Sequence, residues 1–198
     1  MARVAGMASR LIRSTGIAAG IAAVAGLGIG YAAGDPVRPT DIVQPRKLPA
    51  DLCDRLGDVS LLLPKATNLP WQRTGNTEVV CSVGVRSQAQ PTFTAAALKV
   101  RITPYGGRAA GAGQPPFTPA EMAKQAYDRK PWEVLPDRPY PTRIAKSTEA
   151  GGQSWRVSVM VVRADLVVQV DYEAHPITEA AAQQGALVLA DRAIWEAK

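Results

Sequence analysis

The sequence of 198 residues predicts an α+β domain, a mainly antiparallel sheet with packed helices arranged as an α/β sandwich, preceded by one N-terminal transmembrane helix. Three observations predict this fold class. Residues 14–34 carry no charge and follow a basic segment. Several later stretches alternate apolar and polar residues with the period of two that half-buried strands require. Two further stretches, beginning at Thr118 and Thr178, repeat apolar residues at helical spacing.

The first 34 residues predict export from the cytoplasm. Residues 1–13 hold three arginines and no acid, and they are expected to stay cytoplasmic under the positive-inside rule. As a helix, residues 14–34 would be about 31 Å long, enough to cross the hydrocarbon core of a bilayer. The small residues 32–34 leave open a cleavable signal peptide, which would produce a fully secreted protein. Because the uncharged run is longer than a usual signal-peptide core, a single-pass signal-anchor with an extracytoplasmic C-terminal domain is favoured.

The net charge of +6 does not predict nucleic-acid binding. Three of the 23 basic residues lie in the acid-free residues 1–34, and the other 20 accompany 17 acidic residues in 35–198. Basic and acidic residues alternate there without a long run of one sign, as on an ordinary solvated surface. The small positive balance of this part favours anionic lipids or wall polymers only mildly.

The exported part begins with a tether and a short helix. Residues 35–47 are rich in proline and charge and are expected to form an extended tether. The domain proper follows at residues 48–198. Its first segment, 48–57, predicts a helix with Pro49 near its start and Gly57 at its end. One face of this helix is formed by Leu52, Cys53 and Leu56.

Cys53 and Cys81 are the only cysteines in the chain. In an oxidising compartment such an even pair predicts a disulfide bond. A redox or metal-binding dithiol is disfavoured, because the sequence has no Cys-x-x-Cys spacing and no histidine near either cysteine. The disulfide would join the first helix to the core side of the strand that contains Cys81.

Strands are expected in the middle and late parts of the domain. Apolar and polar residues alternate at 79–86, 98–103, 155–162 and 166–173. The last two stretches are separated only by Ala164 and Asp165, which predicts a hairpin.

Two helices and two loops complete the prediction. Thr118 and Glu121 form a capping box, followed by an apolar face of Met122, Ala123, Ala126 and Tyr127. A closing helix follows Thr178, with a predicted apolar face of Ala180, Gln183, Leu187, Ala190, Ile194 and Ala197. Residues 106–117 and 130–152 are expected to be loops, where binding functions are commonly found.

These motifs together resemble one family of proteins. They are Leu-Cys-Asp at 52–54, Val-Val-Cys-Ser-Val at 79–83, the valine-rich hairpin and the alanine-rich closing helix. The chain resembles the exported cell-envelope proteins and lipoproteins of an actinobacterial domain family without an assigned function, over roughly residues 48–198. The resemblance implies a PsbP-like α/β sandwich and supplies no catalytic residues. The chain departs from the lipoprotein members because no lipobox cysteine precedes Cys53, so lipid attachment is not implied.

No motif predicts catalysis, a cofactor or a metal site. His175 is the only histidine and is expected to be a turn residue between the hairpin and the closing helix. A Ser-His-Asp triad is disfavoured because no Gly-x-Ser-x-Gly element is present. The glycine-rich residues 106–113 lack the spacing of a phosphate-binding loop and are expected to form a flexible loop.

One group of aromatic and arginine side chains remains a candidate partner or ligand surface. Such residues are enriched at interfaces and can stack on sugar rings or bind a protein partner. They can equally close the ends of a small core, with arginine stems lying over the aromatic rings. The candidates are Trp71, Arg73, Tyr105, Arg108, Trp132, Tyr140 and Arg143.

The expected function is that of a membrane-tethered, non-enzymatic binding module in the extracytoplasmic part of a bacterial cell envelope. Residues 14–34 would contact the lipid bilayer, and an envelope protein or wall polymer would be the partner. Two alternatives remain open: a fully secreted binding protein after signal cleavage, and an envelope enzyme acting on wall polymer. The enzyme would require a carboxylate pair such as Asp171 and Glu173.

Overall fold

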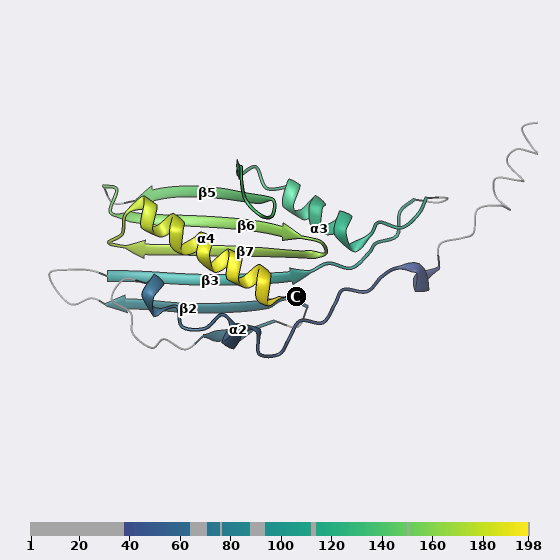
Figure 1. Cartoon of the computed structure of the whole chain (residues 1–198), viewed down its shortest axis with the longest axis horizontal. Coiled ribbons are helices and arrows are strands. Elements are labelled where there is room, and N and C mark those ends of the chain that lie inside the picture. The colour runs from purple at the N-terminus through teal and green to yellow at the C-terminus, as the bar shows by residue number, and fades with distance from the viewer. Residues whose placement is uncertain are drawn as a thin grey trace, which may run out of the picture. The chain divides into compact units, whose positions relative to one another are not determined.

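The computed structural model describes residues 38–63, 71–75, 77–87, 94–111, 114–149 and 151–197. The chain divides into two units. The described residues of the small unit are 38–41, 109–111 and 114–116, and they include the short helix η1, Pro39–Asp41. The large unit, Ile42–Arg108 with Phe117–Lys198, holds the other helices and strands that the structure describes (Figure 1).

The large unit is built on one antiparallel sheet of seven strands. The order across the sheet is β1-β2-β3-β7-β6-β5-β4, and every neighbouring pair is antiparallel. The bounds are β1 Gln72–Thr74, β2 Val79–Ser87, β3 Thr94–Pro104, β4 Glu133–Leu135, β5 Thr142–Glu149, β6 Ser154–Arg163 and β7 Leu166–His175. The helices are α2 Leu52–Arg55, η2 Ser60–Leu62, α3 Pro119–Asp128 and α4 Glu179–Glu196. The predicted α+β class with a mainly antiparallel sheet is therefore confirmed.

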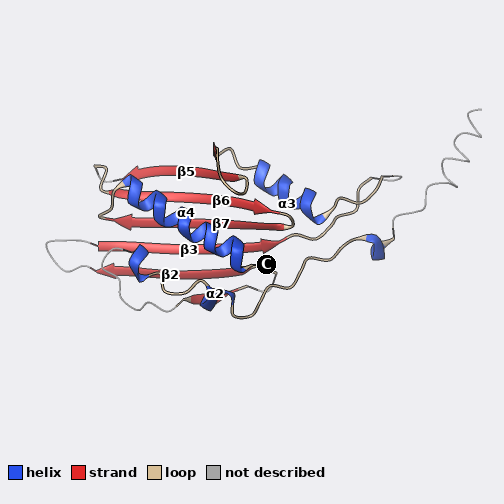
Figure 2. Ribbon diagram, viewed as in Figure 1, coloured by secondary structure: helices blue, strands red, loops and turns tan. Residues whose placement is uncertain are grey.

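Helix α4 crosses one face of the sheet, and the main hydrophobic core lies between them (Figure 2). The predicted alternation of apolar residues directs one side of each central strand into this core. Helix α2 reaches the same core through Leu52, Cys53 and Leu56, the three residues predicted to share a face. The core strands contribute Val79, Cys81, Val83, Leu98, Val100, Ile102, Ile144, Val157, Val159, Val161, Val168, Val170 and Tyr172.

A second, smaller core lies under α3. It contains Ala123 and Tyr127 of the helix with Met160, Val162 and Val167 of the hairpin. These hairpin residues alternate in sequence with those of the main core, so α3 covers the opposite face of the sheet. Strand β6 is accordingly buried on both sides from Val159 to Val162. The result is a sandwich with a helix on each face of the sheet.

The predicted caps and the hairpin are present. Thr118 and Glu121 form the capping box of α3: the Thr118 N–H donates to Glu121 Oε2 at 2.7 Å, and the Glu121 N–H donates to Thr118 Oγ1 at 3.3 Å. The hairpin turn at Ala164 and Asp165 is confirmed, with Ala164 at φ 50°. The first helix is shorter than predicted, because α2 covers only Leu52–Arg55.

The prediction of a loop over residues 130–152 is wrong. This segment contains β4 and β5, and β5 pairs with β6 over eight residue pairs. Of residues 142–148 in β5, only Thr142 and Ile144 are buried, so this part of the strand has no apolar alternation for a sequence pattern to detect. Strand β1, at the other end of the sheet, is likewise short and exposed and was not predicted.

The predicted apolar face of α4 is partly wrong. Ala180 is exposed, and Gln183 and Leu187 are only half-buried. The buried face is instead formed by Ala182, Gly185, Ala186, Leu189, Ala190, Ala193 and Ile194. Small residues on this face let the helix approach the sheet closely. A Cβ atom on Gly185 would lie 3.4 Å from the Tyr172 ring.

The expected N-terminal membrane span lies outside the described residues. Residues 1–37, which include the predicted span 14–34, are not described, and no helix in the described ranges is long and apolar enough to cross a membrane. Residues 42–47 of the predicted tether 35–47 belong to the large unit. Gly107 N–H donates to Val43 O at 2.7 Å, and Arg46 Nε donates to Asp165 Oδ2 at 2.7 Å.

Candidate binding site

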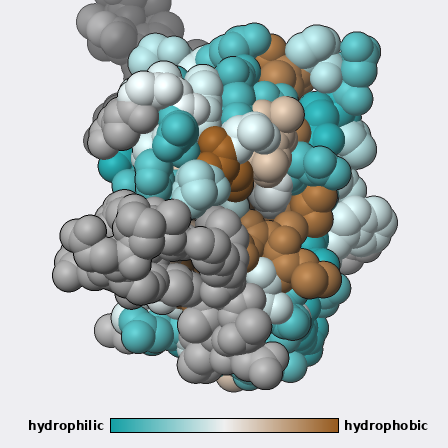
Figure 3. Space-filling view, turned by 90° about the vertical axis from the view of Figure 1, so that its left-hand side faces the viewer, coloured by the Kyte–Doolittle hydropathy of each residue, from teal (hydrophilic) through white to brown (hydrophobic). Residues whose placement is uncertain are grey.

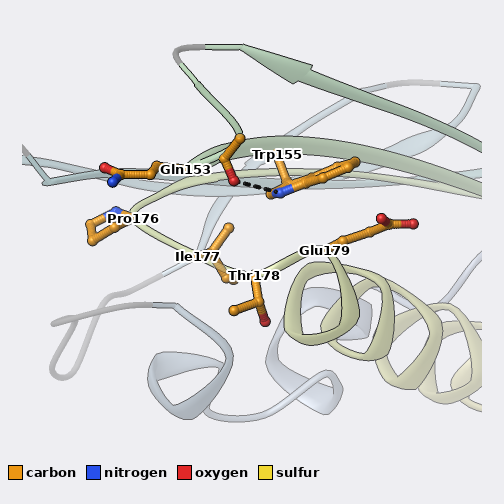
Figure 4. Close-up of a pocket in the computed structure, with 7 residues that line it drawn as sticks. Gln153, Trp155, Pro176, Ile177, Thr178 and Glu179 are labelled. Carbon is orange, nitrogen blue, oxygen red and sulfur yellow. Dashed lines mark hydrogen bonds between the residues drawn. The ribbon is translucent and has the colours of Figure 1, made fainter.

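A cleft lies at the end of the sandwich where β7 passes into α4. Its volume is about 640 Å³, and it is lined by Gly152, Gln153, Trp155, Pro176, Ile177, Thr178 and Glu179. We call it the Trp155 cleft. Gln153 and Trp155 lie on one side of the cleft, and Pro176, Ile177 and Thr178 lie on the other (Figure 4). Figure 3 looks onto this end of the domain and shows patches of apolar surface beside hydrophilic ones.

Two hydrogen bonds to main-chain carbonyl oxygens fix the cleft, one within a side and one across it. The turn between β5 and β6 contains Gly151 and Gly152 at φ 66° and 83°, a conformation that glycine adopts without steric cost. The Trp155 indole donates from Nε1 to Gly152 O at 3.1 Å (Figure 4). Across the cleft, Ile177 N–H donates to Gln153 O at 3.0 Å. The cleft is therefore formed before any ligand binds.

The carboxylate of Glu179 at the edge of the cleft is paired with a lysine. Glu179 stands in the first turn of α4, after the cap Thr178, whose hydroxyl accepts from Ala181 N–H at 3.3 Å. Lys146 Nζ of β5 donates to Glu179 Oε1 at 2.7 Å, and this hydrogen bond raises the pKa of Lys146. Lys146 also donates to Gln183 Oε1 at 3.4 Å. The carboxylate at the mouth of the cleft is thus neutralised from within the protein.

A second groove lies along α4 and shares Ile177 with the cleft. We call it the leucine groove. It has a volume of about 410 Å³ and is lined by Leu61, Leu62, Leu63, Tyr172, Ile177, Ala181, Gln184, Gly185 and Val188. Ile177 lines both spaces. Leu61 is 95% exposed and Val188 is 40% exposed, so large apolar side chains stand in solvent at the groove.

Tyr172 forms part of the groove and ties it to the core. Its side chain is fully buried, and its hydroxyl donates to the carbonyl oxygen of Leu62 in η2. Burial raises the pKa of the Tyr172 phenol from 10.0 to about 12. The phenol is therefore a neutral hydrogen-bond donor at physiological pH, and it holds η2 beside α4.

Alkaline pH is expected to destabilise the domain through Tyr172. Because its pKa is higher in the folded than in the unfolded state, the stabilisation is complete below pH 10 and is lost as the pH rises towards 12. A shift of this size corresponds to roughly 2 to 3 kcal/mol of the free energy of unfolding. Urea unfolding across this pH range measures the loss. The Tyr172→Phe variant, which keeps every other tyrosine, is expected to lose less stability; an equal loss in both proteins would contradict the prediction.

The aromatic and arginine residues predicted as a surface are distributed over separate parts of the sheet. Trp71 packs against the main core beside β1 and donates from Nε1 to Gly57 O at 3.1 Å, whereas Arg73 is exposed on β1. Tyr140 also packs against the main core, under the Arg163 guanidinium at 5.1 Å. The Arg108 guanidinium lies 5.4 Å from the Phe117 ring.

Three of the predicted residues come together on the α3 side of the sheet. Tyr105 and Trp132 pack against the second core, and burial raises the pKa of Tyr105. Arg143 donates from Nη1 to Lys130 O at 3.0 Å and to Trp132 O at 3.1 Å. Its guanidinium lies 4.8 Å from the Tyr127 ring. In this group the arginine guanidinium lies over one aromatic ring of the second core, that of Tyr127.

The carboxylates considered for an enzyme are paired with neighbouring side chains. Asp171 and Glu173 are two residues apart on β7 and lie on the same face of the sheet. Asp171 Oδ1 accepts from the Ser158 hydroxyl at 2.7 Å, and Glu173 Oε2 accepts from Arg156 Nε at 3.0 Å. His175 ends β7 and is half-buried. Over the described ranges, no cluster of three or more His, Cys, Asp or Glu side chains has the arrangement of a metal site.

Sequence reasoning missed the residues of the Trp155 cleft. It placed Trp155 in a strand and began the closing helix at Thr178, as the structure does, but nothing in the sequence indicates that these residues face each other. A tryptophan three residues after a Gly-Gly pair was the one available signal. No family model, curated protein or solved structure matches the chain.

Proposed function

We propose that the chain is a non-enzymatic binding module of the bacterial cell envelope, tethered to the membrane by residues 14–34, and that its ligand binds in the Trp155 cleft. The preformed cleft carries this proposal. It combines an indole, a proline and an isoleucine with a few polar groups, Gln153, Thr178 and Glu179, at its edge. Specific ligand sites commonly have this composition, in which apolar area supplies affinity and polar groups orient the ligand.

The leader and the disulfide support an extracytoplasmic location. A basic segment followed by an uncharged run long enough to span a bilayer is the arrangement of a signal-anchor. The disulfide between Cys53 and Cys81 fits the oxidising compartment that this topology implies. The resemblance to actinobacterial envelope proteins agrees with the same location. A secreted form of the protein would keep the same cleft.

Site-specific photo-crosslinking in intact cells tests the proposal. The full chain would carry a photoreactive amino acid at Gln153, an exposed residue of the cleft, and in a control protein at Lys124, an exposed residue of α3. An adduct with an envelope component is expected at position 153 and not at position 124. No adduct at 153, or the same adducts at both positions, would contradict a ligand site in the cleft. A protease added outside the cells is expected to digest the domain.

A further inference from the structure

We propose that residues 42–46 form a strap that ties the chain to the β6–β7 end of the sheet, so that the Trp155 cleft is the end of the domain that lies away from the membrane. The direction of the membrane rests on the proposed function, whereas the strap rests on contacts between described residues. Three features support the proposal: the seat of the strap on two glycines, its ion pair with the hairpin turn, and the length of β7.

The strap lies across Gly106 and Gly107, just after β3. The Gly107 N–H donates to Val43 O at 2.7 Å. A Cβ atom on Gly106 would lie 2.7 Å from Pro45 Cδ and 3.0 Å from Val43 O, too close for an unstrained contact. The main chain of the strap therefore packs directly on the main chain of Gly106, and a residue without a side chain is needed there.

An ion pair fixes the strap to the turn between β6 and β7. Arg46 Nε donates to Asp165 Oδ2 at 2.7 Å, and Arg46 Nη2 donates to Asp165 Oδ1. The guanidinium thus binds the carboxylate through two parallel hydrogen bonds, the strongest geometry for such a pair. The Asp165 carbonyl oxygen accepts from Tyr105 N–H at 2.8 Å, so the turn is also joined to the residue before the glycine seat. Both attachments hold the strap at the same end of the sheet.

The strap and the Trp155 cleft lie at opposite ends of the sheet. Strand β7 begins at Leu166, directly after Asp165, and ends at His175, directly before Pro176 of the cleft. A strand of ten residues spans about 30 Å. Figure 1 shows the β6–β7 turn at one end of the sheet and the start of α4 at the other.

The length of the tether keeps the strap near the membrane. Residues 35–41 separate the expected span 14–34 from the strap, and they can extend at most about 25 Å. The β6–β7 turn is therefore the end of the sheet that is held close to the bilayer, and the cleft is the distal end. In this orientation the cleft meets molecules outside the membrane and not its lipids. With the strap released, residues 35–47 could extend about 45 Å and would no longer determine which end faces the bilayer.

Proteolysis of the full chain in phospholipid nanodiscs tests the strap. A lysine-specific protease cuts after Lys47, an exposed residue next to the strap, when this segment leaves the domain. Gly106→Ala places a methyl group against Pro45 and is expected to accelerate this cleavage at least about tenfold. Gly111→Ala adds the same group in the same glycine-rich loop, where a Cβ atom meets nothing within 4 Å, and is expected to leave the rate unchanged. Cleavage after Lys99, in the middle of β3, reports unfolding and is expected to stay unchanged in both variants.

Energy transfer to the bilayer tests the orientation. A donor dye is attached to one introduced cysteine, Ala164→Cys or Gln153→Cys, both at exposed positions, and lipid headgroups carry the acceptor. The native cysteines form the disulfide and do not take the dye. Because about 30 Å of strand separates the two positions, transfer is expected to be at least about twofold more efficient from 164 than from 153. Gly106→Ala is expected to reduce this difference, and Gly111→Ala to preserve it.

The outcomes separate this proposal from the proposed function. Equal cleavage after Lys47 in Gly106→Ala and Gly111→Ala would overturn the strap. Equal transfer from both dye positions, or more efficient transfer from 153, would overturn the orientation, and photo-crosslinks at Gln153 would still support a ligand site in the cleft. No transfer from either position would contradict the membrane tether and the orientation together. Missing crosslinks with the expected difference in transfer would overturn the ligand site and leave the orientation in place.

Discussion

The Leu189→Ala substitution is expected to lower the free energy of unfolding by about 4 kcal/mol, whereas Leu187→Ala is expected to cost only about 1 kcal/mol. Leu189 is fully buried between α4 and the sheet, whereas Leu187 is half-buried and packs against the margin of the same core. Removing a fully buried leucine side chain loses its transfer free energy and leaves a cavity, because the surrounding core relaxes only partly.

The pair of variants is internally matched. Both substitutions replace leucine by alanine within α4, so the change in helix propensity cancels in the comparison. Urea unfolding of the full chain, followed by circular dichroism, measures both losses. The sequence pattern placed Leu187 on the buried face, so equal losses or a larger loss at Leu187 would support that pattern and contradict the structure.

Breaking the Cys53–Cys81 disulfide is expected to lower the free energy of unfolding by about 3.5 kcal/mol. The bond joins α2 to the core side of β2, as predicted from the sequence, and connects residues 28 positions apart with a Cα–Cα distance of 5.6 Å. In the chain-entropy model, the cross-link lowers the conformational entropy of the unfolded chain by closing a loop of that length. Breaking the bond restores this entropy and so stabilises the unfolded state. Cys53 and Cys81 are also buried, so their sulfur atoms contribute to packing in α2 and β2.

Urea unfolding with and without dithiothreitol measures this loss. The double variant Cys53→Ala, Cys81→Ala is expected to match the reduced wild type in order of magnitude and to show no response to the reductant. A loss below about 1 kcal/mol, or an effect of reductant on the double variant, would contradict the prediction. Alkylation without reductant is expected to label no cysteine, because the described structure contains no free cysteine.

The central strands could be predicted because buried and less buried positions alternate along each of them. In β2, β3, β6 and β7, every second residue enters the main core, so burial imposes an alternating pattern on the sequence. The capping box of α3 was predictable for a similar reason, since its partners Thr118 and Glu121 are three residues apart. Local chemistry of this kind can be recognised without the tertiary structure.

Strand β5 and the orientation of α4 could not be predicted in this way. Ile144 is the one large apolar residue of β5 that enters the core. The strand is held in the sheet mainly by its backbone pairing with β6. In α4 the buried face is mostly alanine and glycine, which resemble the exposed alanines in hydropathy. Close packing of the helix on the sheet requires small residues on the buried face. The buried and exposed faces of α4 therefore differ little in hydropathy, and the sequence pattern does not distinguish them.

By itself, the sequence determined the class of the domain, the disulfide pair, the central strands and the hairpin, because each depends on local periodicity or on residue type. Only the tertiary structure decided where a ligand can bind. The register of β6 against β7 sets Trp155 opposite Ala174, which brings the indole to the residues that follow β7. Ile177 then meets Gln153, and the helix begins beside them. Such a site depends on contacts between distant segments, and those contacts exist only once the sheet has formed.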